Sequence, residues 1–266
     1  MRKKVVILWL ASLMVLVPIV MIILWAVAVK WTYPAVLPSQ YGWLYFRRAY
    51  ADPNFWPSIW NSTVIAFVAT VVTLAIALPA CRFLTMQHLL SGRLIEFIIY
   101  LPMILPAIAI VTSTETEFLR WQLSGTYLGV VILHVFFMLP YAMQIMLESY
   151  RKMGTAYQLT AYNLGANTWQ TFWRVTLPLL RPGLIAAASL CYIISYSQYL
   201  PTFFVGDSNI ITLPLLLIPF ANNGRFGVGS VYSIIFIVTS LIGVGVITTI
   251  IGGRHGIKRQ RNYLSL

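Results

Sequence analysis

Charged residues are scarce in this chain of 266 residues: they make up 9% of it, whereas soluble proteins contain about 25%. A water-soluble globule could not cover its surface with so few charges, so a soluble domain is excluded. The hydrophobic residues, 59% of the chain, fall in runs of about twenty with little alternation of polar and apolar positions. Such runs predict helices that cross a bilayer rather than the strands of a transmembrane barrel.

Residues able to carry out chemistry are also few. Cys81 and Cys191 fall at or inside apolar runs, so we expect no disulfide. His88, His134 and His255 lie in separate segments without a Cys or carboxylate at ligand spacing, so we expect no metal site. There is no phosphate-binding glycine loop ending in Lys-Ser or Lys-Thr and no persuasive pair of nucleophile and base. We therefore predict a non-catalytic chain that binds no cofactor.

Six apolar runs are long enough to be membrane spans. The first follows Arg2, Lys3 and Lys4, but it is too long for a signal peptide and no small-x-small cleavage site closes it, so we expect a retained anchor. Pro102 and Pro106 predict kinks in the third run, because each removes a helical hydrogen bond. The predicted spans are Val5–Val29, Ile59–Ala80, Ile95–Val111, Tyr127–Leu147, Leu184–Val205 and Val231–Ile251.

Positive charge indicates which side of the membrane holds the termini. With six spans both termini share one side, and thirteen of the eighteen Lys and Arg residues then lie on that side. Because cytoplasmic loops are enriched in Lys and Arg, we predict a multi-pass membrane protein with cytoplasmic termini. The net charge of +12 follows from this topology and does not indicate nucleic-acid binding. The cations left outside are Lys30, Arg47, Arg48, Arg120 and Arg225.

The outer segment 30–58 is rich in aromatic residues. Such rings prefer the headgroup layer of a bilayer, which favours an interfacial belt, and a docking surface for an outer partner stays open as the alternative. The rings in question are Trp31, Tyr33, Trp43, Tyr45 and Trp56.

The longest inside segment, 148–181, is polar yet patterned as structure. Residues 156–164 are compatible with a helix that has one apolar face, and Gly165 fits the end of that helix, where a residue without a side chain accepts a positive φ angle. The apolar face carries Leu159, Tyr162 and Ala166.

A second helix is expected after this glycine. Asn167 or Thr168 can cap it, and it should run through the aromatic residues 169–173 until Pro178 interrupts it. A helix, a glycine turn and a second helix beneath the bilayer form a rigid element that a soluble motor can push. The pattern alone also fits an amphipathic helix resting on anionic lipid.

The interval from glycine to proline is similar to that of a known family. Gly165 is followed by nine residues and then by 175–178, VTLP, and 179–183 continue as LLRPG. This resembles the signature Glu-Ala-Ala, three residues, Gly, nine residues, Ile-x-Leu-Pro of permease subunits of binding-protein-dependent ATP-binding-cassette importers, which include the maltose, polyamine and thiamine systems. Lipid binding makes no demand on that spacing, so the interval favours the permease interpretation.

The start of the signature differs. Leu159 and Thr160 stand where the family has Glu and its first Ala, and Ala161 alone is retained. In the family that Glu reaches into the ATPase, so the resemblance implies an apolar change at this point of the contact. A weaker resemblance covers residues 59–251, including YLPTFFVG at 199–206, and implies a small organic solute that is thiamine-like or polyamine-like.

The resemblance implies an all-α membrane protein of about six transmembrane helices, with a cytoplasmic coupling helix between spans four and five. Its implied partners are a dimer of ATPase subunits that binds ATP and Mg, a second permease subunit, identical or homologous, and a periplasmic or extracellular solute-binding protein. The residues implied in coupling are Tyr157, Leu159, Thr160, Ala161, Tyr162, Leu164, Gly165, Ala166, Val175, Leu177 and Pro178.

Polar side chains in the fifth predicted span are candidates for a solute pathway. Polar groups inside a membrane are costly and face either a pathway or another helix, and the sequence leaves both interpretations open. No Asp or Glu lies in the middle of a predicted span, which argues against a proton relay. The candidates are Tyr192, Ser195, Tyr196, Gln198 and Tyr199.

We divide the chain into an anchor with its outer loop (1–58), a permease domain (59–251) that contains the coupling segment 148–182, and a basic cytoplasmic tail (252–266). One alternative is an ion-coupled secondary transporter, which would require intramembrane carboxylates and an internal repeat, neither of which is apparent. The other is a membrane-embedded enzyme or assembly factor.

Overall fold

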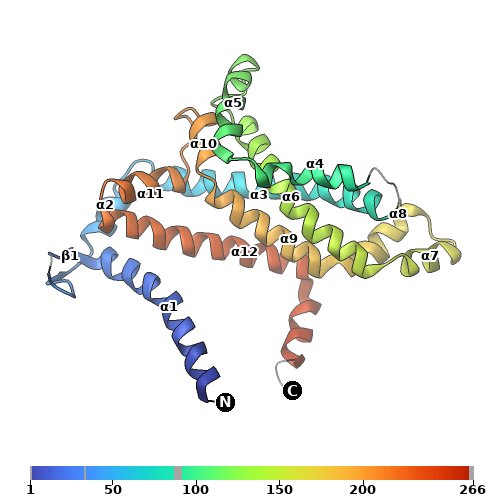
Figure 1. Ribbon diagram of the computed structural model, residues 1–266, viewed down its shortest axis with the longest axis horizontal. Helices are drawn as coiled ribbons and strands as arrows, with labels where there is room; N and C mark the ends of the chain where they lie inside the picture. The colour runs from blue at the N-terminus through green and yellow to red at the C-terminus, as the bar shows by residue number, and fades with distance from the viewer. Residues whose placement is uncertain (1, 33, 87–91, 264–266) are drawn as a thin grey trace. The chain divides into compact units, whose positions relative to one another are not determined.

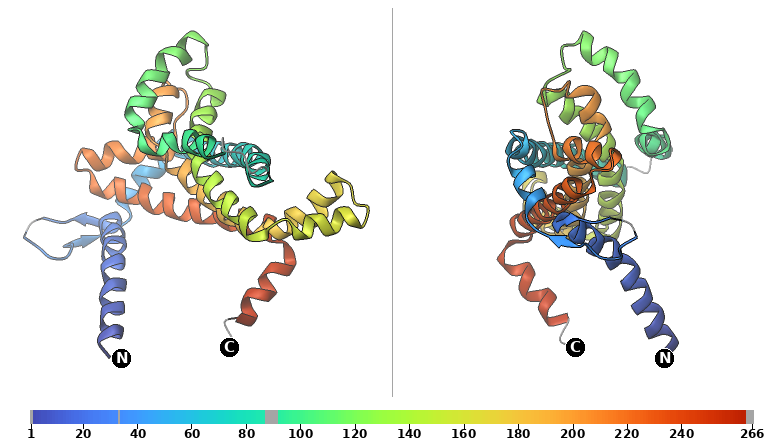
Figure 2. Two further views of the ribbon diagram at one scale, coloured as in Figure 1. Left: turned by 45° about the vertical axis from the view of Figure 1, so that its right-hand side comes forward. Right: turned by 90° about the vertical axis from the view of Figure 1, so that its left-hand side faces the viewer.

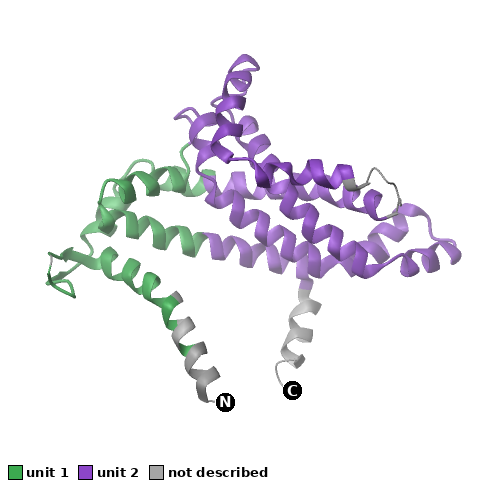
Figure 3. Cartoon of the chain, in the orientation of Figure 1, with its two compact units in different colours: residues 1–61, 211–239 green, residues 62–210, 240–266 purple. Residues whose placement is uncertain are grey.

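The computed structural model describes residues 2–32, 34–86 and 92–263 (Figure 1). Two compact units make up the chain (Figure 3). Unit 1 comprises residues 1–61 and 211–239, and unit 2 comprises residues 62–210 and 240–266. The division into 1–58, 59–251 and 252–266 follows the sequence pattern and stays a prediction. His88 and the end of the predicted tail, 264–266, lie outside the described residues.

The described residues are predominantly helical, which confirms the predicted all-α class. The helices are α1 Arg2–Val27, α2 Leu44–Tyr50, α3 Phe55–Met86, α4 Gly92–Ile104, α5 Ala107–Arg120, α6 Tyr127–Met153, α7 Ala156–Asn163, α8 Thr168–Thr171, α9 Leu177–Ser197, α10 Leu200–Val205, α11 Leu213–Asn222 and α12 Phe226–Tyr263. A π-helix, η1 Phe172–Thr176, joins α8 to α9. Strands β1 Ala28–Lys30 and β2 Gln40–Tyr41 form a small antiparallel hairpin.

Among the described residues, four helices are long and apolar enough to cross a membrane, and a strongly bent pair makes a fifth candidate. Two shorter apolar helices, Leu16–Val27 and Leu213–Asn222, accompany them. These spans confirm a helical membrane protein, while the count of six stays a prediction. The long helices are Phe55–Thr85, Tyr127–Met153, Thr168–Ser197 and Phe226–Gly253, and the bent pair is Leu94–Ile104 with Ala107–Arg120.

Two predicted spans are interrupted. The run Ile95–Val111 is more than kinked: α4 and α5 meet at 97°, and Pro106 adopts an extended conformation as the N-cap of α5. The run Leu184–Val205, expected as one helix, breaks at Gln198, whose ψ of 115° is also extended, and restarts in α10. Pro201 lies in the first turn of α10, where its missing N–H costs no hydrogen bond.

Unit 2 is built around the contact of α6 with α9, the most extensive between its described helices. The buried residues of α9 recur every three or four positions along one stripe, as expected for a helix with a single packed face. A second hydrophobic cluster joins α3, α5, α6 and α10, and consists of Ile65, Phe118, Val130, Leu133, Val205 and Ile210. Cys81 and Cys191 are buried free thiols of this unit.

Unit 1 contains the β-hairpin, α2 and α11. The amide Nδ2 of Asn61 donates to the carbonyl of Ile211 at 2.9 Å, which ties the start of α3 to the segment before α11. In the predicted outer segment, Trp31 packs on Trp25 of α1 with ring centroids 4.5 Å apart, whereas Trp43 and Trp56 are exposed. Tyr33 lies outside the described residues.

The close approach of α6 and α9 generates a testable expectation. A Cβ added at Gly183 of α9 would lie 2.7 Å from the Cβ of Ser149 on α6, closer than carbon atoms pack. We expect Gly183→Ala to destabilise the detergent-purified chain by about 1–3 kcal/mol, seen as a lower thermal midpoint. The double variant Ser149→Gly/Gly183→Ala should recover most of the loss.

Gly245→Ala is the matched control for that experiment. A Cβ at Gly245, in a described helical stretch of α12, meets no atom of the structure within 4 Å. Its thermal midpoint should therefore match the wild type or exceed it. Equal midpoints for Gly183→Ala and Gly245→Ala would contradict the α6–α9 contact.

Candidate coupling element and solute pathway

The predicted coupling segment forms a helical projection at one end of unit 2. α7 and α8, yellow in Figure 2, extend beyond the ends of α6 and α9, to which they are joined directly. α5 and α10 gather elsewhere in the same unit, away from α7 (Figure 1). The segment between α6 and α9 is therefore structured along its length, as its sequence indicates.

The turn between α7 and α8 has the predicted geometry. Gly165 has a φ of +84°, and the Ala166 amide donates to the Ala161 carbonyl at 3.0 Å, which closes the end of α7. Asn167 caps α8: its side chain accepts from the Gln170 amide at 2.8 Å, and the Gln170 side chain accepts from the Asn167 amide at 3.1 Å. This reciprocal pair is a capping box. The expectations for Gly165 and for Asn167 as the cap are both confirmed.

The expectation that Pro178 interrupts the second helix is wrong. A continuous helix runs from Thr168 to Ser197, and its π-helical turn, η1, ends just before Pro178. Pro178 then lies in the first turn of α9. Because the π-helical turn shifts the hydrogen-bond register, a residue without an N–H is accommodated there without a break.

Two side-chain hydrogen bonds fasten α7 to the rest of unit 2. Gln158 is buried and its Nε2 donates to Oγ1 of Thr176, also buried, at 3.2 Å. One turn further along the same face of α7, the Arg82 guanidinium, near the end of α3, donates to the Tyr162 hydroxyl at 3.2 Å. Sequence reasoning missed Arg82, Gln158 and Thr176, since nothing local marks a polar residue of a short helix as buried.

The predicted coupling residues divide into an inner and an outer set. Ala161 is buried, and Tyr162, Ala166, Val175, Leu177 and Pro178 are partly buried. The outer set is exposed, although most of it is apolar, and Leu164 is 83% exposed. Exposed apolar surface of this kind marks a site that another molecule covers. The outer set is Tyr157, Leu159, Thr160, Leu164 and Gly165, with Trp169 and Trp173 beside it.

The predicted pathway residues lie on and just after α9. Tyr192, Ser195 and Tyr196 are buried, and Gln198 and Tyr199, at the break before α10, are partly buried. The Tyr192 ring rests on Gly243 of α12, where a Cβ would overlap it. Within one chain, the buried three therefore contribute to helix packing, and the two at the break are the more accessible.

A histidine that the sequence does not single out as functional links these elements. His134 of α6 is buried, with Nδ1 2.8 Å from Oγ of Ser195 and Nε2 3.0 Å from Oγ1 of Thr202. Its two ring nitrogens thus hold α9 and α10 on either side of their break. Among the described residues, no three His, Cys, Asp or Glu side chains come together as a metal site.

These features define a class of protein. A bundle of apolar helices carries, between two of its spans, an exposed helical projection that is attached by continuous helix and by buried hydrogen bonds. This is the architecture of a membrane transport subunit.

Comparison with known proteins identifies the family. Residues 83–254 match the family described as the binding-protein-dependent transport system inner membrane component, and the chain belongs to this family. It is therefore a multi-pass inner-membrane transport subunit, and the prediction that it is non-catalytic is confirmed by its permease relatives.

Individual relatives agree with this assignment. The chain is 26% identical to the probable ABC transporter permease protein y4oR of Sinorhizobium fredii, over 66% of the chain and 63% of that relative. It is 22% identical to the putative 2-aminoethylphosphonate transport system permease protein PhnV of Salmonella typhimurium, over 85% and 84%. In fold it resembles a bacterial ABC transporter that imports alginate, with a TM-score of 0.66, 21% identity and 95% of each chain covered.

The turn at Gly165 can be tested by hydrogen–deuterium exchange of the backbone amides around it. A Cβ at this position meets no atom within 4 Å, so any cost of substitution comes from the positive φ angle. We expect Gly165→Val to cost about 1–2 kcal/mol and to speed exchange of the Ala166 amide about tenfold. Gly165→Asn should have a smaller effect, because Asn tolerates this conformation. Backbone amides of α6 serve as the internal reference. An unchanged exchange rate of the Ala166 amide in Gly165→Val would contradict the hydrogen bond that closes the end of α7.

Proposed function

We propose that this chain is the permease subunit of an ATP-driven importer, in which it lines the solute pathway and receives force through the α7–α8 projection. The observation that carries the proposal is the apolar projection itself, which is stiffly attached yet exposed. Family membership supports it, because the family consists of membrane components that work with binding proteins.

The exposed apolar side chains of the projection require a partner protein that covers them. Tyr157, Leu159 and Leu164 are exposed apolar side chains of the projection that a dimer of ATPase subunits covers, and that dimer binds the ATP and Mg. Leu159 is exposed on this surface at the position where the family has Glu, so its contact in the ATPase groove is apolar. Closure of the ATPase dimer then moves α6 and α9 through the projection.

The remaining partners complete the pathway. A second permease subunit, identical or homologous, faces this chain across the pathway, and a solute-binding protein delivers solute on the outer side. Gln198 and Tyr199 are the pathway residues most accessible within the single chain. Both termini are cytoplasmic, as the distribution of Lys and Arg indicates. Residues 59–251 act as the permease domain, with 1–58 as anchor and outer loop and 252–266 as tail.

We infer that the solute is a small organic molecule. The resemblance at 199–206 favours a thiamine-like or polyamine-like solute, whereas PhnV is named for 2-aminoethylphosphonate and the structural relative imports alginate. Uncharged Gln and Tyr groups at the α9–α10 break suit hydrogen bonding to an organic solute. Mass spectrometry of the ligand that co-purifies with the partner binding protein identifies the solute directly.

The ATPase contact is tested by co-purification of the chain with the ATPase encoded beside it. We expect Leu164→Asp to lower the recovered ATPase at least about tenfold, because it replaces a buried apolar contact by an unpaired charge. Trp121→Asp is the control, since Trp121 is also exposed but ends α5, away from α7. ATPase recovery unaffected by Leu164→Asp, or uptake by this chain alone without ATP, would refute the proposal.

A further inference from the structure

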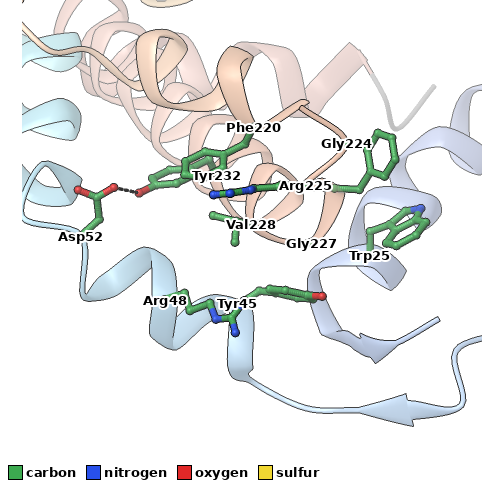
Figure 4. A pocket seen from close by; sticks show the side chains of 11 residues that line it. Trp25, Tyr45, Arg48, Asp52, Phe220, Gly224, Arg225, Gly227, Val228 and Tyr232 are labelled. Atoms are coloured by element: carbon green, nitrogen blue, oxygen red, sulfur yellow. Dashed lines mark hydrogen bonds between the residues drawn. The ribbon is translucent and has the colours of Figure 1, made fainter. Parts of the chain in front are cut away.

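Unit 1 contains a cavity that none of the predicted coupling or pathway residues lines. Its volume is about 550 Å³, and it lies among α2, the end of α11, the start of α12 and Trp25 of α1 (Figure 4). Aromatic rings line much of it, including those of Tyr45, Phe220 and Tyr232. The close packing of Gly227 against the Tyr45 ring joins α12 to α2 at this wall.

Three charged side chains line this cavity, and their charges are unbalanced. They are Arg48, Arg225 and Asp52. Asp52 already accepts two hydrogen bonds, from the Tyr232 hydroxyl at 3.0 Å and from the Asn54 amide at 2.9 Å. The ion pairs found within the described part of the chain involve neither arginine. Two guanidinium groups and one carboxylate thus give the lining a formal net charge of +1, from two positive groups and one negative group.

The arginines approach the cavity from two elements. In Figure 4 the Arg225 side chain extends from the start of α12 toward the Tyr232 and Phe220 rings, and Arg48 comes from α2 on the other side. The Arg48 guanidinium carbon lies 5.9 Å from the centroid of the Tyr45 ring, a contact that favours one orientation of the side chain. Guanidinium groups bind phosphate oxygens in a fixed, bidentate geometry.

The surroundings in unit 1 indicate where such an anion would come from. α1 and α11 are strongly apolar helices, and the same unit exposes Trp43 and Trp56, rings typical of the headgroup layer. An arginine pair in a unit that also carries apolar helices and exposed interfacial aromatics is suited to meet the phosphates of lipid headgroups.

We propose that this cavity binds the phosphate of an anionic phospholipid headgroup, held by Arg48 and Arg225. The aromatic walls contact the glycerol part of the lipid. A zwitterionic headgroup binds more weakly, because its cationic amine is repelled by the two guanidinium groups, which outnumber the single Asp52 carboxylate of the lining. The site requires neither the ATPase nor the solute.

The test is native mass spectrometry of the intact, delipidated chain with phosphatidylglycerol, phosphatidylcholine or inorganic phosphate added separately. Wild-type chain should retain phosphatidylglycerol at least about tenfold more strongly than phosphatidylcholine. The double variant Arg48→Gln/Arg225→Gln should lose this preference. Arg47→Gln is the matched control, because Arg47 is the neighbouring cation of α2 and does not line the cavity.

Each other outcome overturns the proposal. Equal retention of the two lipids, or a preference that survives in the double variant, rules out the arginine pair as a lipid site. Binding of inorganic phosphate without a preference for phosphatidylglycerol assigns the cavity to a free oxyanion. The thermal midpoint of every variant is measured without lipid, to check that the variants fold alike. Arg225→Lys keeps the charge but not the bidentate geometry, so it should retain part of the preference for phosphatidylglycerol.

Discussion

Transmission of force through the α7–α8 projection requires that α7 be firmly attached to the helices around it. A short helix between two spans would swing freely if only its chain connections held it. The buried bond from Gln158 to Thr176 and the bond from Arg82 to Tyr162 instead anchor its packed face at two points one turn apart, to η1 and to α3. η1 then continues into α9 without a break, so a displacement of the projection is passed to a membrane span.

Backbone hydrogen bonding in an apolar medium explains how the rest of unit 2 is arranged. A break in a membrane helix leaves polar groups that lipid cannot satisfy, so breaks occur where other protein groups are available. At the α9–α10 break, His134 bonds to Ser195 on one side and to Thr202 on the other. The break therefore lies against α6, which supplies hydrogen-bonding groups on both sides of it.

The sequence predicted what depends on local chemistry. The runs that became α3, α6 and α12, the positive φ of Gly165 and the cap at Asn167 follow from composition and spacing alone. A kink in the third span was predicted from its prolines, but its full break, the break at Gln198 and the continuous helix through Pro178 were not. A proline fixes its own φ, whereas neighbouring helices decide whether the chain kinks, breaks or adopts a π-helical turn. Buried polar pairs such as Gln158 with Thr176 require the tertiary contact to be recognised.

The proposed coupling requires the α7–α8 projection and α9 to move as one rigid body. Spin labels on the exposed positions Ala156 of α7 and Leu190 of α9, in a chain assembled with its ATPase, measure this directly as a distance distribution. We expect the same narrow distribution without nucleotide and with ATP trapped. A distribution that shifts or broadens when ATP binds would show that the projection moves separately from the span, and would rule out rigid coupling.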